Sequence, residues 1–159
     1  MKFLRGKTED AYQLASMQAR IFEKSAEKEI PSYFFIQDFM FSNDAKGLDD
    51  LSFLTSGSSE LEIYLNIINN LKRKTGTIYP SEIMHWIGFF YRYASYLSGL
   101  SSITIFKKIS PQYLNKIYPL YHGLDIVKAV EMVFDDLGIN NSSPLEKFID
   151  LYKTKKIIL

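Results

Sequence analysis

Residues 80–97 read Pro80-Ser81-Glu82-Ile83-Met84-His85-Trp86-Ile87-Gly88-Phe89-Phe90-Tyr91-Arg92-Tyr93-Ala94-Ser95-Tyr96-Leu97. Proline is favoured in the first turn of a helix, and Gly88 is the one helix breaker that follows it in this stretch. At about 100° per residue, a narrow polar stripe runs along such a helix and its other sides are apolar. We therefore predict a central, aromatic-rich helix over about 80–97.

Helix-start signals recur along the rest of the chain. A short acceptor side chain in front of an apolar stripe satisfies the free N–H groups of a first helical turn, and proline is tolerated there. Such signals are Thr8, Ser59 with Glu62 three residues later, Ser101 or Ser102, Ser110-Pro111, Asp125 with Gly138 as the stop, and Ser143-Pro144. No long run alternates with period two, and no repeat stands out. The sequence predicts an all-α, single-domain bundle of about seven to eight helices over residues 1–159.

Four segments carry more detailed expectations. Residues 33–41 are apolar nearly all round, which favours a buried helix and leaves a buried strand as the alternative. Residues 43–47 have the composition of a turn. In the helix after Ser59, we expect one apolar stripe to point inward, namely Leu61, Tyr64, Leu65, Ile68 and Leu71. The last expected helix follows Ser143 and buries Leu145, Phe148, Ile149 and Tyr152.

Composition excludes several kinds of chemistry. The chain has 159 residues, a net charge of +1, two histidines and no cysteine, so we expect no disulfide, no cysteine nucleophile, no metal site and no cofactor. No signal peptide is visible and no stretch reaches about 20 apolar residues, which predicts a cytoplasmic protein without a membrane partner. Residues 30–70 contain six acidic residues and one basic, residues 71–116 seven basic and one acidic. We expect these two segments to face each other.

The polar stripe of residues 80–97 is the first candidate site. Within an arc of about 80° lie Glu82, His85, Phe89, Arg92 and Tyr96. In a structural interpretation, Arg92 is an internal strut whose five N–H donors pair with a carboxylate or with backbone carbonyls. In a functional interpretation, Glu82, His85 and Arg92 line a pocket in which Arg92 binds a phosphate or carboxylate. Simple exposure of the stripe to solvent is the third interpretation.

Tyr121 and His122 form a second candidate site at the end of a predicted helix. A histidine at such a junction typically bonds a backbone carbonyl, although it would serve as a general base if Glu82 or Asp125 met it in space. The sequence contains no phosphate-binding loop, nucleophile elbow or HExxH motif. An enzyme is therefore not favoured.

Two more features bear on partners. Five basic residues, Lys72, Arg73, Lys74, Lys107 and Lys108, give a weak signal for nucleic acid, because cations at helix ends are explained by the helix dipole. The eleven tyrosines are a stronger signal, since tyrosine is enriched at protein interfaces. Part of this excess is expected to form a patch that binds a protein partner.

Four stretches resemble a known family. They are Ser32-Tyr33-Phe34-Phe35-Ile36-Gln37-Asp38-Phe39-Met40, Leu51-Ser52-Phe53-Leu54, Trp86-Ile87-Gly88-Phe89-Phe90-Tyr91-Arg92-Tyr93, and Tyr118-Pro119-Leu120-Tyr121-His122 with Asp125 and Ala129. Over roughly residues 30–135 the chain is similar to the DUF3791-type group of small bacterial proteins. The resemblance implies the small partner in a two-gene, toxin–antitoxin-like locus, and it implies no catalytic residues.

These features together predict a non-catalytic interaction module, an antitoxin-like or regulatory partner that binds another bacterial protein such as a cognate toxin. One alternative is a small enzyme or nucleotide-binding toxin component that uses Glu82, His85, Arg92 and His122. Another is a helical nucleic-acid-binding domain. A close approach of Arg92 and His122 around an open pocket would favour the enzyme, and Arg92 locked to a buried carboxylate would count against it. The oligomeric state stays open.

Overall fold

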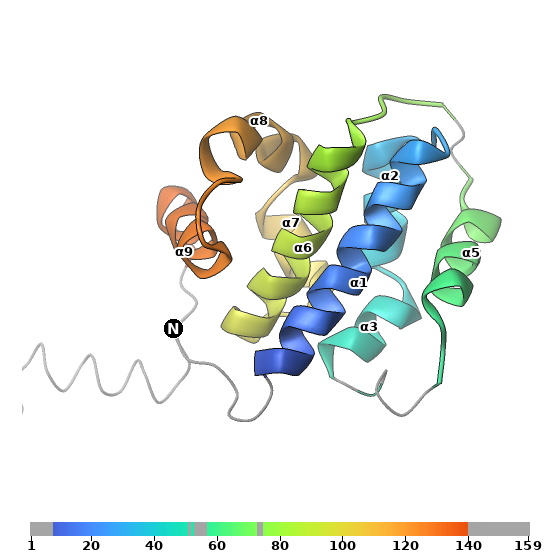
Figure 1. Cartoon of the computed structure of the whole chain (residues 1–159), viewed down its shortest axis with the longest axis horizontal. Helices are drawn as coiled ribbons and strands as arrows, with labels where there is room; N and C mark the ends of the chain where they lie inside the picture. The colour runs from blue at the N-terminus through green and yellow to red at the C-terminus, as the bar shows by residue number, and fades with distance from the viewer. Residues whose placement is uncertain (1–7, 51, 53–56, 73–74, 140–159) are drawn as a thin grey trace, which may run out of the picture.

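The computed structural model describes residues 8–50, 52, 57–72 and 75–139, and these residues form eight helices and no strand (Figure 1). The helices are α1 (Thr8–Glu27), α2 (Ser32–Met40), α3 (Asn43–Asp49), α5 (Glu60–Asn70), α6 (Ser81–Ser98), α7 (Ser102–Lys108), α8 (Pro111–Tyr121) and α9 (Ile126–Leu137). The expected all-α architecture is confirmed. None of the described helices is long and apolar enough to cross a lipid bilayer.

Helices α1 and α6 lie side by side at the centre of the fold (Figure 1). The side of α1 that faces the interior includes Ala15 and Ala19, both of which are fully buried. Gly88 lies where α6 meets this helix, because a Cβ atom built on it would be 2.9 Å from the carbonyl oxygen of Gln18 and 3.0 Å from the Cα atom of Ala19. The missing side chain of Gly88 therefore lets the two backbones touch.

Aromatic rings fill the space between α1 and α2. The ring of Phe22 meets those of Phe35 and Phe39 edge to face, with centroids 5.8 and 5.1 Å apart. All three rings are fully buried, and each such pair adds a directional attraction to the burial of apolar area. Helices α3 and α5 pack against α2, while α8 and α9 lie on the far side of α6 from α1 (Figure 1).

Local sequence signals place several helix ends where they were expected. At the start of α5, the Ser59 hydroxyl accepts the N–H of Glu62, and the Glu62 carboxylate accepts the N–H of Ser59. Asp125 caps α9, which ends at Gly138 in the left-handed conformation. Residues 33–41 lie mostly in α2, so the helix interpretation is confirmed over the strand.

One local prediction is wrong, and a second is wrong in part. Residues 43–47 belong to α3 rather than to a turn, because the Ser42 hydroxyl caps this helix at the Ala45 N–H and Leu48 anchors it in the core. At α5, Leu61 and Leu65 are 51% and 40% exposed, whereas Tyr64 and Leu71 of the expected stripe are buried together with Ile63 and Ile67. Apolar residues occupy most sides of α5, so periodicity does not select the buried stripe. The helix expected after Ser143 lies outside the described residues.

We expect Gly88→Ala to destabilise the fold. The new methyl group would press on backbone atoms of α1, which cannot rotate away, and overpacking of this kind costs about 1–3 kcal/mol. The gain in helix propensity, about 1 kcal/mol at most, would offset only part of that loss. Urea denaturation followed by circular dichroism measures the difference.

Gly123→Ala is the matched control, because a Cβ atom there meets nothing within 4 Å. Its free energy of unfolding should stay close to that of the parent chain. Equal stability of the two variants would contradict a close contact between α1 and α6.

Candidate functional site

The structure divides the polar stripe of α6 into two parts. Glu82, His85 and Phe89 line an open pocket near the start of the helix. Arg92 and Tyr96 lie beyond it, around a small cavity of about 20 Å³ beside Asp49. The predicted cluster is therefore not one site, and each part has its own chemistry.

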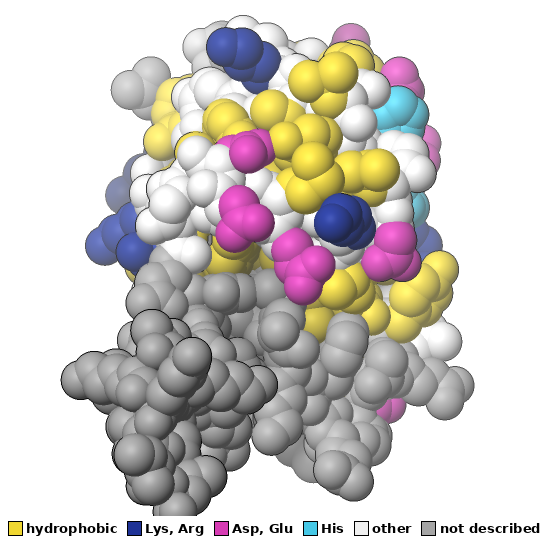
Figure 2. Space-filling view, turned by 90° about the vertical axis from the view of Figure 1, so that its left-hand side faces the viewer, with side chains coloured by type: hydrophobic (Ala, Val, Ile, Leu, Met, Phe, Trp, Pro, Cys, Tyr) yellow, Lys and Arg dark blue, Asp and Glu magenta, His cyan; other side chains and the backbone are white. Residues whose placement is uncertain are grey.

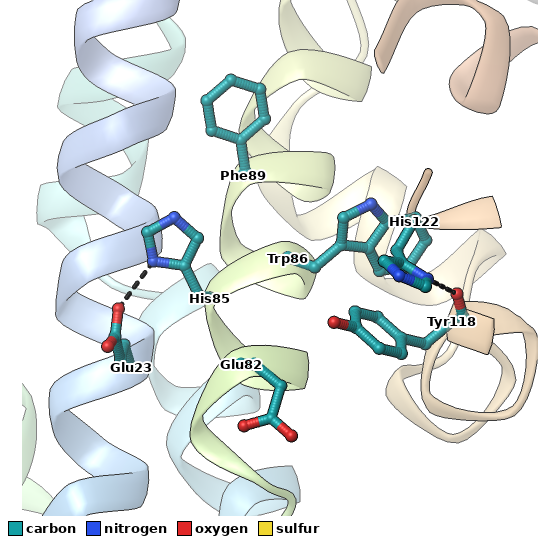
Figure 3. A pocket seen from close by; sticks show the side chains of 7 residues that line it. All are labelled: Glu23, Glu82, His85, Trp86, Phe89, Tyr118 and His122. Carbon is teal, nitrogen blue, oxygen red and sulfur yellow. Dashed lines mark hydrogen bonds and ion pairs between the residues drawn. The ribbon is translucent and has the colours of Figure 1, made fainter. Parts of the chain in front are cut away.

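The open pocket has a volume of about 380 Å³ and is formed by three helices (Figure 3). Helix α1 supplies one side chain, α6 supplies four, and the end of α8 supplies two. These residues are Glu23, Glu82, His85, Trp86, Phe89, Tyr118 and His122. We call this site the α1–α6–α8 pocket. Its walls combine aromatic rings with carboxylates and imidazoles.

His85 pairs with Glu23 across the α1–α6 contact. The Nδ1 atom of His85 is 2.7 Å from Oε1 of Glu23, and both side chains are partly exposed (Figure 3). An ionised carboxylate only accepts hydrogen bonds, so Nδ1 carries the hydrogen atom. In the neutral ring, Nε2 is then left with a lone pair and acts as an acceptor.

His122 ends α8 and follows the same rule. Its Nδ1 atom donates to the backbone carbonyl of Tyr118 at 2.7 Å, which is the backbone bond expected for a histidine at this junction. The imidazole also stacks on the Tyr118 ring, with centroids 4.3 Å apart and planes 13° apart. Glu82 lines the same pocket, but no hydrogen bond joins it to His122 in the described structure. Asp125 caps α9 instead, so neither carboxylate expected to activate His122 as a general base is hydrogen-bonded to it in the described structure.

Trp86 fixes the aromatic side of the pocket. Its ring meets Tyr118 edge to face at 5.7 Å and lies 5.3 Å from the ring of Phe90, which is fully buried. Phe89 stacks on Tyr93 at 5.5 Å. These contacts hold the aromatic walls in place without closing the pocket.

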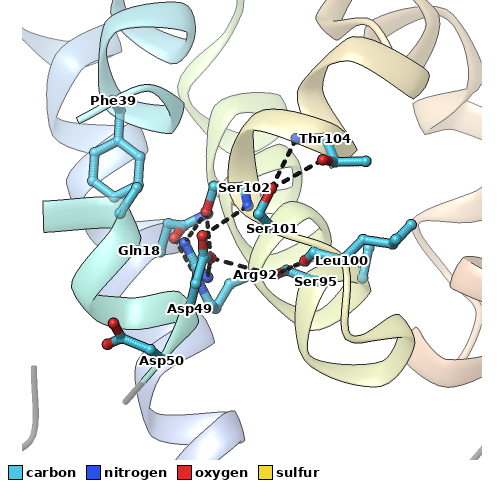
Figure 4. Close-up of polar contacts among 12 residues, drawn as sticks. Gln18, Phe39, Asp49, Asp50, Arg92, Ser95, Leu100, Ser101, Ser102 and Thr104 are labelled. Atoms are coloured by element: carbon cyan, nitrogen blue, oxygen red, sulfur yellow. Dashed lines mark hydrogen bonds and ion pairs between the residues drawn. The ribbon is translucent and has the colours of Figure 1, made fainter. Parts of the chain in front are cut away.

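Arg92 lies in a buried polar network (Figure 4). Its side chain is 3% exposed, and its Nη1 atom donates to Oδ1 of Asp49 at 2.6 Å. The Nε atom donates to Gln18 and the Nη2 atom to Ser102, both at 2.8 Å. Burial lowers the pKa of Arg92, and the Asp49 carboxylate opposes that effect. Arg92 has the partners expected of an internal strut, and it does not approach His122 around an open pocket.

Asp49 completes this network, which we call the Arg92–Asp49 network. Its two carboxylate oxygens accept the backbone N–H and the hydroxyl of Ser102 at 2.9 and 2.6 Å. Gln18 in turn donates to the Gly88 carbonyl at 3.0 Å. The ion pair also joins the acidic segment 30–70 to the basic segment 71–116.

Tyr96 and Tyr121 have separate surroundings. Tyr96 is half-buried at the far end of the stripe, where its ring contacts Tyr93. The hydroxyl of Tyr121 donates to the carboxylate of Asp136 on α9. This hydrogen bond, with a smaller contribution from desolvation, raises the pKa of Tyr121 to about 12.

Sequence reasoning did not select several residues of these sites. Glu23 lies 62 positions before His85, Asp49 lies 43 positions before Arg92, and neither stands in a recognisable motif. Trp86 and Tyr118 follow the ordinary spacing of helix-packing residues, so nothing in the sequence separates them from core rings. Among the described residues, no three acidic or histidine side chains are placed to share a metal ion.

Comparison of the chain with protein-family models, with curated proteins and with solved structures gives no match.

We expect Arg92→Leu to lower the free energy of unfolding by about 3 kcal/mol or more. The substitution leaves the Asp49 carboxylate without its counter-charge in a largely buried position, and breaking a buried pair costs about 3–5 kcal/mol. Chemical denaturation of the purified variant measures this loss.

The matched control is Arg20→Leu, which removes an ion pair with Glu60 between side chains 53% and 41% exposed. Exposed pairs contribute about 1 kcal/mol or less. Similar losses in the two arginine variants would contradict a structural role for Arg92.

We expect Asp136→Asn to lower the pKa of Tyr121 from about 12 toward the ordinary tyrosine value. The amide keeps an acceptor oxygen but loses the negative charge that disfavours the phenolate. In the parent chain, this raised pKa contributes stability that is present below about pH 10 and is lost as the pH rises toward about 12. NMR titration of ring-labelled tyrosine, with Tyr121→Phe for assignment, measures the change, and an unchanged pKa would contradict the hydrogen bond.

Proposed function

We propose that the protein is a non-catalytic interaction module, an antitoxin-like or regulatory partner that binds another bacterial protein through α8 and α9. The observation that carries this proposal is Leu120, which is 76% exposed at the end of α8. Covering an exposed leucine with the apolar groups of a partner removes apolar area from water, which favours association.

Helices α8 and α9 present other exposed apolar side chains. Leu124 and Leu137 are 39% and 38% exposed, and Figure 2 shows hydrophobic side chains gathered on this side of the molecule with acidic side chains among them. Between residues 125 and 137 there are four acidic residues and one lysine. We call Leu120, Leu124, Leu137 and the acidic residues Asp125, Glu131, Asp135 and Asp136 the α8–α9 surface. Apolar side chains within a charged rim are typical of protein interfaces.

The geometry supports the two alternatives less well. Arg92, the residue expected to bind an anionic substrate, already donates hydrogen bonds to three side chains inside the Arg92–Asp49 network. The acidic α8–α9 surface repels a phosphate backbone, which requires Lys and Arg contacts. Lys107 and Lys108 are exposed, and Arg73 and Lys74 lie outside the described residues.

The test is isolation of a complex from the native host with a tagged chain, followed by measurement of its dissociation constant with purified components. We expect a stoichiometric complex with one protein. Leu120→Gln should weaken it about tenfold or more, since the variant loses apolar burial and buries an amide instead.

Leu61→Gln is the matched control. Leu61 is 51% exposed on α5, which lies on the opposite side of the molecule from α8 (Figure 1). A complex that Leu120→Gln leaves intact, or that both variants weaken equally, would contradict the proposed surface. Elution of the chain with nucleic acid and without protein would contradict the proposed function.

A further inference from the structure

We infer that the α1–α6–α8 pocket binds the guanidinium group of an arginine side chain. That this arginine belongs to the protein partner rests on the proposed function, whereas the chemistry of the pocket stands on its own geometry.

The polar groups of the pocket are mainly hydrogen-bond acceptors. Glu23 and Glu82 present carboxylate oxygens, which accept hydrogen bonds and do not donate them. Nδ1 of His85 and Nδ1 of His122 are already occupied as donors, so each ring in its neutral form adds an acceptor at Nε2. A ligand that satisfies this pocket must therefore be rich in N–H donors.

The pocket carries negative charge. No lysine or arginine lines the pocket, and Glu82 is exposed without an ion pair or hydrogen bond to any residue in the described part of the chain. Glu23 is bonded through Oε1 to a histidine, which leaves its other oxygen available. Two carboxylates in one pocket repel an anion and attract a cation.

The aromatic rings of the pocket suit a planar ligand. Trp86, Phe89 and Tyr118 supply aromatic walls, and Figure 3 shows Trp86 and Tyr118 on the α8 side of the pocket and His85 with Glu23 on the α1 side. A guanidinium ion is planar and weakly hydrated, so it stacks on aromatic faces while its edge donates to carboxylates. An ammonium ion has three donors and no plane, and it holds its water more strongly. The combination of rings and acceptors therefore favours arginine over lysine.

The pocket also lies where a partner would reach it. Leu120 and His122 both belong to the exposed end of α8, but at about 100° per residue their side chains point to opposite sides of it, so a partner reaches both only by wrapping around this end. A partner that covers Leu120 can place one arginine beside His122 and between the carboxylates. The pocket would then fix the orientation of a contact whose apolar area comes from the α8–α9 surface.

Trp86 makes the inference directly testable, because it is the chain's single tryptophan and lines the pocket. The experiment titrates the purified full chain with Nα-acetyl-arginine amide at constant ionic strength and records tryptophan fluorescence. The matched probe is Nα-acetyl-citrulline amide, which has nearly the same shape and no charge. We expect a saturable change with the arginine probe at millimolar concentration and at least about fivefold weaker binding of the citrulline probe.

Glu82→Gln should weaken binding of the arginine probe about fivefold. It keeps the size of the side chain and breaks no contact described above. Glu27→Gln, on the same helix as Glu23 but outside the pocket, should leave the affinity unchanged. Equal binding of the arginine and citrulline probes, or an unaffected Glu82→Gln variant, would overturn the inference.

Two further probes separate related ligands. Nα-acetyl-lysine amide with a free side-chain amine should bind more weakly than the arginine probe, and equal or tighter binding would overturn the assignment to guanidinium. Free arginine should also bind more weakly, because its α-carboxylate meets the pocket's negative charge; tighter binding would overturn a partner side chain as the source. These titrations need no partner, so their failure is distinct from failure of the Leu120→Gln test.

Discussion

A buried guanidinium must find a partner for each of its polar edges, and this requirement organises the centre of the fold. Arg92 on α6 meets it with Gln18 from α1, Asp49 from α3 and Ser102 from α7. Four helices, α1, α3, α6 and α7, are thereby held at fixed positions. The pair does not need to add much net stability for this, because desolvation offsets most of its Coulomb energy. Its effect is that other arrangements of these helices would leave a charge buried alone.

The close contact at Gly88 belongs to the same arrangement. Gln18 accepts from Arg92 and donates to the Gly88 carbonyl, so one side chain links the ion pair to the point where the backbones meet. The polar stripe of α6 has two environments, because different helices lie against its two parts. Near Arg92 the stripe is covered by α3 and α7, whereas near His85 it faces the end of α8 and stays open.

The sequence predicts what depends on neighbours in the chain. The caps at Ser59 and Asp125 and the stop at Gly138 involve groups only a few residues apart, and they appear in the structure. The inward face of α5 could not be predicted, because Leu61 and Ile63 are equally apolar and tertiary packing decides between them. The candidate site was predicted in part, because His85, Glu82 and His122 share a pocket. The pairing of His85 with Glu23, and the separation of Arg92 from this pocket, depend on how the helices pack. Such pairings carry no local signal.

Pro119 gives the α1–α6–α8 pocket walls of unequal stiffness. Proline has no N–H, so the last turn of α8 lacks the helical bond that residue 119 would otherwise donate to residue 115. Tyr118 and His122 stand on this weakened turn, while Glu23 and His85 stand on two helices in backbone contact. The α1–α6 side of the pocket is therefore rigid, and the α8 side moves more easily. Groups of different bulk would be accommodated by displacement of the α8 end, and the central helices would keep their places.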